Sequence, residues 1–201
     1  MDWAGFALAV LLIELTPGPN MAWLAGLALV DGRRAALAAV AGVAVGLMIN
    51  GMLAAAGLAL LVSTRPEIFA VLRWGGAVMM LWLAYQAWRD GNATQAAAAR
   101  DTSDARHFWS GLAVNLLNPK ALLFYIAIAP QFLGSERFTM VQALTLTAIS
   151  ASIATVVHLL LVWQALRAHG WVSDPRRTRL VRRALAIGLL GVALWFVAQT
   201  A

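Results

Sequence analysis

Long apolar stretches alternate with short polar stretches along the whole chain. A membrane-spanning helix needs about 20 predominantly apolar residues. Six stretches are long enough, namely residues 3–30, 35–62, 68–88, 108–133, 139–166 and 180–200. The pattern therefore predicts an all-α integral membrane protein with six transmembrane helices.

The longest polar segment divides the six predicted helices into two groups of three. Residues 1–88 form a first three-helix half, residues 89–107 a linker, and residues 108–201 a second half, and together they make one transmembrane domain. Because each half crosses the membrane an odd number of times, two halves with the same fold must lie upside down relative to each other. Many secondary transporters are built this way, and we expect two inverted three-helix repeats.

Proline-containing sequences interrupt one predicted helix in each half. Thr16-Pro17-Gly18-Pro19-Asn20 lies in the first helix, and Asn118-Pro119-Lys120 lies in the fourth. Proline has no N–H and its ring clashes with the carbonyl four residues earlier, so each sequence ends one half-helix and allows another to begin. Broken helices at corresponding places in two halves indicate a transporter's binding site. The alternative is a pair of kinks, because neighbouring helices can satisfy the freed backbone groups.

The two breaks offer groups that suit a zwitterionic amino acid. A new helix N-terminus presents unpaired N–H groups and a partial positive charge, which attract a carboxylate. The prolines also free the carbonyls of Ile13, Leu15 and Asn115, which suit an ammonium group. The candidate substrate-binding residues are therefore Thr16, Pro17, Gly18, Pro19, Asn20, Asn115, Asn118, Pro119 and Lys120.

Ionisable side chains lie inside the two broken helices. Glu14 precedes Gly18 by one helical turn, and Lys120 directly follows Pro119. A charge at the bilayer centre costs at least ~2.5–3.5 kcal/mol on insertion scales, so a functional role is the default hypothesis. We interpret Glu14 as a candidate proton carrier. A structural ion pair between Glu14 and Lys120 is the alternative, and transport could open such a pair.

Two further polar residues lie within predicted helices. His158 is the only histidine well inside one, and it either bonds a carbonyl in the core or takes part in proton coupling, since histidine titrates near operating pH. Asn50 continues a stripe of small residues formed by Gly42 and Gly46. Such a stripe indicates close helix packing, and the alternative for Asn50 is a place on the transport pathway.

The composition excludes several functional classes. The chain is 62% hydrophobic and 12% charged with a mean hydropathy of +0.76, whereas soluble domains are about 45–50% apolar and about 25% charged. No cysteine is present, which rules out disulfides and thiolate metal sites. The sequence also lacks a His-Glu-x-x-His zinc motif and a glycine-flanked serine nucleophile. We therefore expect neither an enzyme nor a metal or cofactor.

The arginines are concentrated on one side of the predicted membrane topology. Three arginines lie on the side of the termini, namely Arg65, Arg73 and Arg137. The segments after the first, third and fifth helices carry eleven, namely Arg33, Arg34, Arg89, Arg100, Arg106, Arg167, Arg176, Arg177, Arg179, Arg182 and Arg183. Lysine and arginine mark the cytoplasmic side, so both termini are expected to be extracytoplasmic. This distribution explains the net charge of +6 without nucleic-acid binding, which needs a basic soluble face.

Taken in order, these features resemble the LysE/RhtB family of bacterial amino-acid exporters. The similarity covers nearly the whole chain. It includes the first proline sequence, Gly32-Arg33-Arg34-Ala35, Gly42 and Gly46, Asn115-Leu116-Leu117-Asn118-Pro119-Lys120, Phe124 and Pro130-Gln131-Phe132. The resemblance implies export of amino acids or their derivatives across the bacterial inner membrane, driven by proton antiport.

Two positions depart from what the resemblance implies. Glu14 stands where the family often has a small or hydroxyl residue, and His158 stands near a position that is often acidic. These departures leave the proton-coupling group open between Glu14 and His158. The expected partners are an amino-acid substrate, protons and the lipid bilayer.

Four points stay open at the level of sequence. A passive channel is one alternative, because pores also use broken helices. A non-transporting membrane scaffold is another, but it leaves Glu14 and Lys120 unexplained. The sequence does not distinguish a monomer from a homodimer, and it does not name the amino acid.

Overall fold

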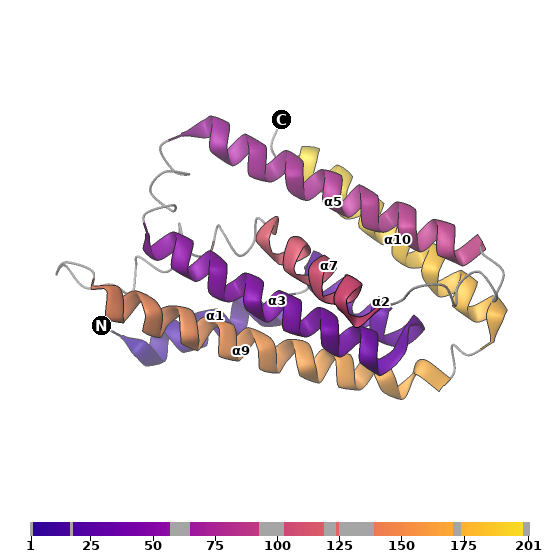
Figure 1. Cartoon of the computed structure of the whole chain (residues 1–201), viewed down its shortest axis with the longest axis horizontal. Helices are drawn as coiled ribbons and strands as arrows, with labels where there is room; N and C mark the ends of the chain where they lie inside the picture. The colour runs from indigo at the N-terminus through magenta and orange to yellow at the C-terminus, as the bar shows by residue number, and fades with distance from the viewer. Residues whose placement is uncertain are drawn as a thin grey trace.

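A computed structural model describes residues 2–16, 18–56, 65–92, 103–118, 124, 139–170 and 174–198. All regular secondary structure in these residues is helical (Figure 1). The main helices are α1 (Trp3–Leu15), α2 (Pro19–Val30), α3 (Gly32–Ala55), α5 (Pro66–Asn92), α7 (Asp104–Leu116), α9 (Met140–Arg167) and α10 (Pro175–Ala198). The expectation of an all-α fold is therefore confirmed for these residues.

Two helices in the described residues are long and apolar enough to cross a membrane unaided. They are Gly32–Ala54 within α3 and all of α9, each with a mean hydropathy of 2.0 over its best window. The pair α1 and α2 passes the same test together and is bent by 56° at the break. Helices α5 and α10 are not among these; α10 begins with the arginine-rich sequence 175–183, and α5 carries charges at both ends. The six-span plan therefore remains a prediction.

The helices form a bundle in which α3 and α9 lie side by side and run in opposite directions (Figure 1). On one side α3 packs against α7, and α2 contacts α3, α9 and α10. A second pair, α5 and α10, also packs together in opposite directions. The helices therefore form a bundle whose interior contains both the end of α7 and the α1–α2 break.

Small residues let these helices approach closely. A Cβ added at Gly42 would collide with the Phe108 carbonyl of α7, and one at Gly111 would collide with the Ala39 carbonyl of α3. A Cβ at Gly46 would lie 2.9 Å from the Asn115 Cβ. The expected packing role of Gly42 and Gly46 is thus seen at the α3–α7 contact.

The apolar side chains divide between the core and the outer surface. Ten buried residues of α2, α3 and α9 form one cluster, and Phe6, Val10, Leu146 and Phe124 form another, with the rings of Phe6 and Phe124 centred 5.6 Å apart. Large apolar side chains also cover the outside, among them Leu12, Val71, Val78 and Ile187. Such a surface suits contact with lipid chains rather than water.

Candidate functional site

The first predicted helix is interrupted where its prolines stand. Helix α1 ends at Leu15, and α2 begins at Pro19 with Gly18 as its N-cap. The Thr16 N–H donates to the Ile13 carbonyl at 3.0 Å, and the Thr16 hydroxyl donates to the Leu12 carbonyl at 3.0 Å. Pro17 lies outside the described residues.

The second break begins where α7 ends, at Leu116. The Asn118 N–H donates to the Asn115 carbonyl at 3.0 Å. From α3, the Asn50 amide donates to the same carbonyl at 3.2 Å and to Asn115 Oδ1 at 3.3 Å. Pro119, Lys120 and residues 130–132 lie outside the described part of the chain, so the continuation of this predicted helix is not described.

These contacts correct one expectation about the freed carbonyls. The carbonyls of Ile13 and Asn115 were expected to bind an ammonium group, but both already accept hydrogen bonds within the protein. The Asn115 carbonyl accepts two, which uses both of its lone pairs. The side chains around the breaks are therefore better placed to bind a cationic group.

Residues from both breaks line one small cavity. Gly18 and Asn118 face it from the two halves, and the described residues that line it are Glu14, Gly18, Asn20, Met21, Leu47, Asn115, Asn118 and His158. The cavity volume is about 20 Å³, close to what one water molecule requires. The space among the described residues is thus too small for an amino acid.

An acid and a histidine face each other across this cavity. Glu14 Oε2 of α1 lies 3.7 Å from His158 Nε2 of α9, and their side chains are 18% and 3% exposed. The distance fits an ion pair rather than a short hydrogen bond. The histidine thus faces a carboxylate, and the anticipated contact between Glu14 and Lys120 falls on a residue outside the described ones.

Three buried carboxamides complete the polar lining. Asn20, Asn115 and Asn118 are each at most 5% exposed. Within the described structure, Asn20 Oδ1 has no hydrogen-bond partner. A buried acceptor without a partner is rare, and this one can accept a hydrogen bond from a ligand or a water molecule in the cavity.

The start of α2 also faces the cavity. Asn20 and Met21 belong to its first turn and line the space, and its N-cap Gly18 has no side chain that could accept hydrogen bonds from that turn. Unpaired N–H groups at a helix start favour an anion. The cavity therefore presents acceptor groups at Glu14 and Asn20 together with the positive end of a helix.

The sequence interpretation found most of this lining but missed its apolar wall. Met21 and Leu47 line the cavity. The only sequence feature that could have indicated this is that they directly follow Asn20 and Gly46 in the chain. Thr16 was expected at the site, but its exposed side chain bonds the Leu12 carbonyl and does not line the cavity. Asn50 also stays outside the lining and contacts Asn115 instead.

A sequence model of the LysE type translocator family matches residues 11–200. The match includes both breaks and every residue that lines the cavity. The chain belongs to the LysE type translocator family. The resemblance seen in the sequence is confirmed, and the protein is a membrane transporter rather than an enzyme.

Several relatives of this translocator are named efflux proteins. It is 31% identical to the homoserine/homoserine lactone efflux protein of Salmonella typhimurium, over 90% of this chain and 89% of the relative. It is 32% identical to the leucine efflux protein of Klebsiella pneumoniae, over 75% and 74%. It is 28% identical to the threonine efflux protein of Salmonella typhi, over 65% and 66%. No solved structure matches the translocator.

Proposed function

We propose that this translocator exports amino acids or their derivatives from the cytoplasm across the bacterial inner membrane, in exchange for protons. The observation that carries the proposal is the cavity itself, because both breaks line it and it contains an acid–histidine pair. The names of the relatives, which include homoserine, leucine and threonine efflux, support small neutral amino acids as the substrate class.

The substrate carboxylate would bind on the side of the α2 N-terminus. The first-turn N–H groups beside Asn20 and Met21 provide positive charge, and the amides of Asn115 and Asn118 provide donors. Lys120 follows Asn118 by two residues in the sequence and is proposed to add a positive charge there. The apolar wall of Met21 and Leu47 would then receive the substrate side chain.

The substrate ammonium would bind at Glu14 and Asn20 Oδ1. A carboxylate that binds an ammonium group cannot hold a proton at the same time, so substrate and proton compete for Glu14. Competition of this kind couples the two fluxes in opposite directions. His158, 3.7 Å from Glu14, is proposed to pass the proton to and from that carboxylate.

We also infer that the two halves are inverted repeats with broken first and fourth helices. The contacts between the halves support this, because proposed equivalent helices pair with each other, α3 with α9 and α5 with α10. The contact of α3 with α7 has its counterpart in the contact of α9 with α1. A two-fold axis that exchanges the halves produces both kinds of contact.

The proposed orientation has both termini outside the cytoplasm. The turn between α2 and α3, the end of α5, and the starts of α7 and α10 lie at one end of the bundle (Figure 1). Polar contacts join them, including Arg34 to Asp104 at 3.4 Å and the Arg183 guanidinium 5.3 Å from the Trp88 ring centre. Since this end is rich in arginine, the positive-inside rule assigns it to the cytoplasm.

Counterflow in liposomes tests the proposal. Purified protein is placed in liposomes loaded with unlabelled homoserine, threonine or leucine, and uptake of a labelled trace of the same compound is followed. A carrier accumulates label transiently, a passive channel only equilibrates it, and a scaffold moves none. Gly18→Leu is the matched control, because its side chain would fill the cavity and should abolish counterflow while the protein stays folded in the membrane.

A further inference from the structure

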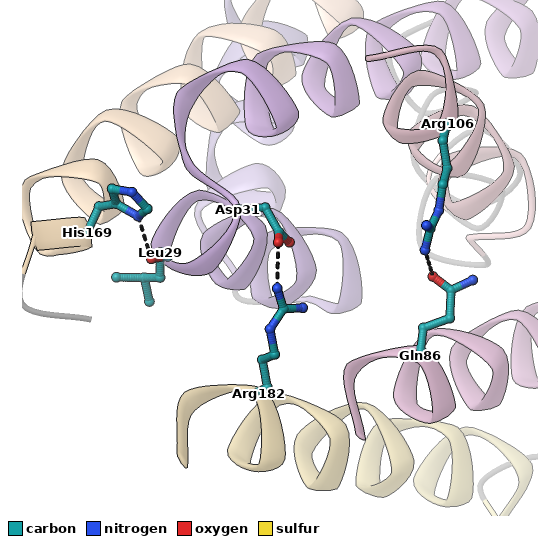
Figure 2. A network of polar contacts seen from close by, with 6 residues as sticks. All are labelled: Leu29, Asp31, Gln86, Arg106, His169 and Arg182. Atoms are coloured by element: carbon teal, nitrogen blue, oxygen red, sulfur yellow. Dashed lines mark hydrogen bonds and ion pairs between the residues drawn. The ribbon is translucent and has the colours of Figure 1, made fainter. Parts of the chain in front are cut away.

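A second polar network lies beyond the cavity, at the arginine-rich end of the bundle. Asp31, which follows α2, accepts a hydrogen bond from Arg182 of α10 at 2.6 Å (Figure 2). The ring nitrogen His169 Nδ1, just after α9, lies 2.7 Å from the Leu29 carbonyl. Both contacts fasten the last turn of α2 to neighbouring helices.

The Asp31–Arg182 pair is protected from water yet not fully buried. The Asp31 and Arg182 side chains are 19% and 14% exposed. The pair bridges residues 151 positions apart in the chain, one from each half. An ion pair in such a place holds two elements together and still opens at moderate cost, because water can reach both partners once they separate.

Helix α2 connects this network to the cavity. Its first turn lines the cavity with Asn20 and Met21, and its other end is followed directly by Asp31. Between these points Leu24 and Ala28 are fully buried, and Gly26 packs closely against Leu185 of α10. The helix is therefore a short rigid rod with a break at one end and an ion pair at the other.

We propose that α2 is the inner gate of the translocator, hinged at the break beside Gly18 and held closed by the Asp31–Arg182 pair. Opening that pair lets the cytoplasmic end of α2 swing away from α10, which exposes the cavity to substrate. This gating role rests on the proposed function, because an exporter must load its substrate from the cytoplasm. Helix α1 ends at Leu15 and α2 begins at Pro19, so no continuous helix obliges the two half-helices to move together.

Cysteine accessibility measures this gate directly. The chain contains no cysteine, so Met21→Cys introduces a single thiol that lines the cavity on α2. An impermeant thiol reagent is applied to inside-out membrane vesicles, and the labelling rate is measured with and without Asp31→Asn or Arg182→Gln. We expect each change to speed labelling about tenfold. A tenfold change corresponds to about 1.4 kcal/mol less free energy favouring the closed position of α2.

The control uses a second ion pair at the same end. Arg34 and Asp104 lie 3.4 Å apart, but their side chains are 89% and 54% exposed, so Arg34→Gln should leave the labelling rate unchanged. The double change Asp31→Arg with Arg182→Asp restores a pair and should slow labelling again. Thermal unfolding in detergent checks that each variant is folded. If a single change unfolds the protein, the labelling rate of the variant with the swapped pair still tests the gate.

Two results would overturn the gate: unchanged labelling in folded Asp31→Asn and Arg182→Gln, or an equal increase in Arg34→Gln. The labelling assay needs no transported substrate, so it stands apart from the counterflow assay. Faster labelling without any counterflow would support a moving α2 and refute the exporter. Counterflow without any change in labelling would support the exporter and refute the gate.

Discussion

At the scale of single residues, the proposed proton coupling depends on the contact between Glu14 and His158. The two groups lie 3.7 Å apart on α1 and α9, and each lines the cavity. The sequence placed both residues inside helices but gave no sign that they meet. They are 144 positions apart in the sequence, and only the packing of α1 on α9 brings them together.

Glu14→Gln should separate transport from the proton gradient. The glutamine keeps the size of the side chain and can still accept a hydrogen bond from a substrate ammonium, but it cannot carry a proton. We expect counterflow to persist while a pH gradient no longer drives accumulation. The measurement is amino-acid uptake into liposomes after a pH jump, and an undiminished response to the jump would assign the proton to His158 or another group.

His107 should make the protein sensitive to acid. It is 7% exposed, its Nε2 has no partner in the described structure, and its pKa is lowered from 6.5, first because burial disfavours the charged ring. Asp31 and Asp104 oppose this shift, and Arg106 and Arg182 add to it.

The sign of the effect follows from the lowered pKa. Below pH 6.5 the unfolded chain binds a proton that the folded chain resists, so stability falls as the pH drops from 6.5 toward the folded pKa. Thermal unfolding in detergent measured across this range should show a loss that His107→Gln reduces. Equal acid sensitivity in both proteins would contradict this account.

At the scale of elements, the helix α3 organises the bundle through close contacts. Gly42 faces the Phe108 carbonyl, and Gly51 faces the Thr147 side chain of α9. Asn50, between these glycines, bonds the Asn115 carbonyl that Pro119 is expected to leave without its helical partner. Helix α3 thus packs against two helices of the second half, α7 and α9, and supports the second break.

Gly42→Ala should destabilise the protein, whereas Gly191→Ala should not. The added methyl at position 42 meets the backbone of α7, which cannot yield locally, and overpacking of this kind costs typically about 1–3 kcal/mol. At Gly191 in α10 nothing lies within 4 Å, and alanine gains about 0.5–1 kcal/mol of helix preference. Thermal unfolding compares the two, and similar effects would show that the α3–α7 contact is not tightly packed.

The sequence predicted the elements better than their contacts. Proline chemistry placed the interruption between Leu15 and Pro19, and hydrophobic length predicted α3 and α9. Helix α7 begins at Asp104, a few residues before the apolar run, because Ser103 caps it by accepting from the Arg106 N–H. The Asn50–Asn115 and Asp31–Arg182 contacts could not be predicted, since no local pattern encodes which helices pack together.

At the scale of the whole molecule, one end gathers the arginines and the other carries the start of α1. This uneven distribution of arginine between the two ends predicts the orientation proposed above. Single cysteines at Asp2 and Ala98 should respond oppositely to an impermeant thiol reagent on intact cells, with labelling at position 2 and none at position 98. Labelling at position 98 alone would reverse the topology and place the α2 gate on the outer side.

Proton movement that accompanies amino-acid efflux tests the central claim most directly. Liposomes that contain the protein, an amino acid and a pH-sensitive dye are diluted into buffer without the amino acid. Exchange predicts that the lumen acidifies as the amino acid leaves. Homoserine, threonine or leucine inside the liposomes should produce this acidification, and Gly18→Leu should abolish it. Efflux of the amino acid with no change in luminal pH would contradict proton antiport through this cavity.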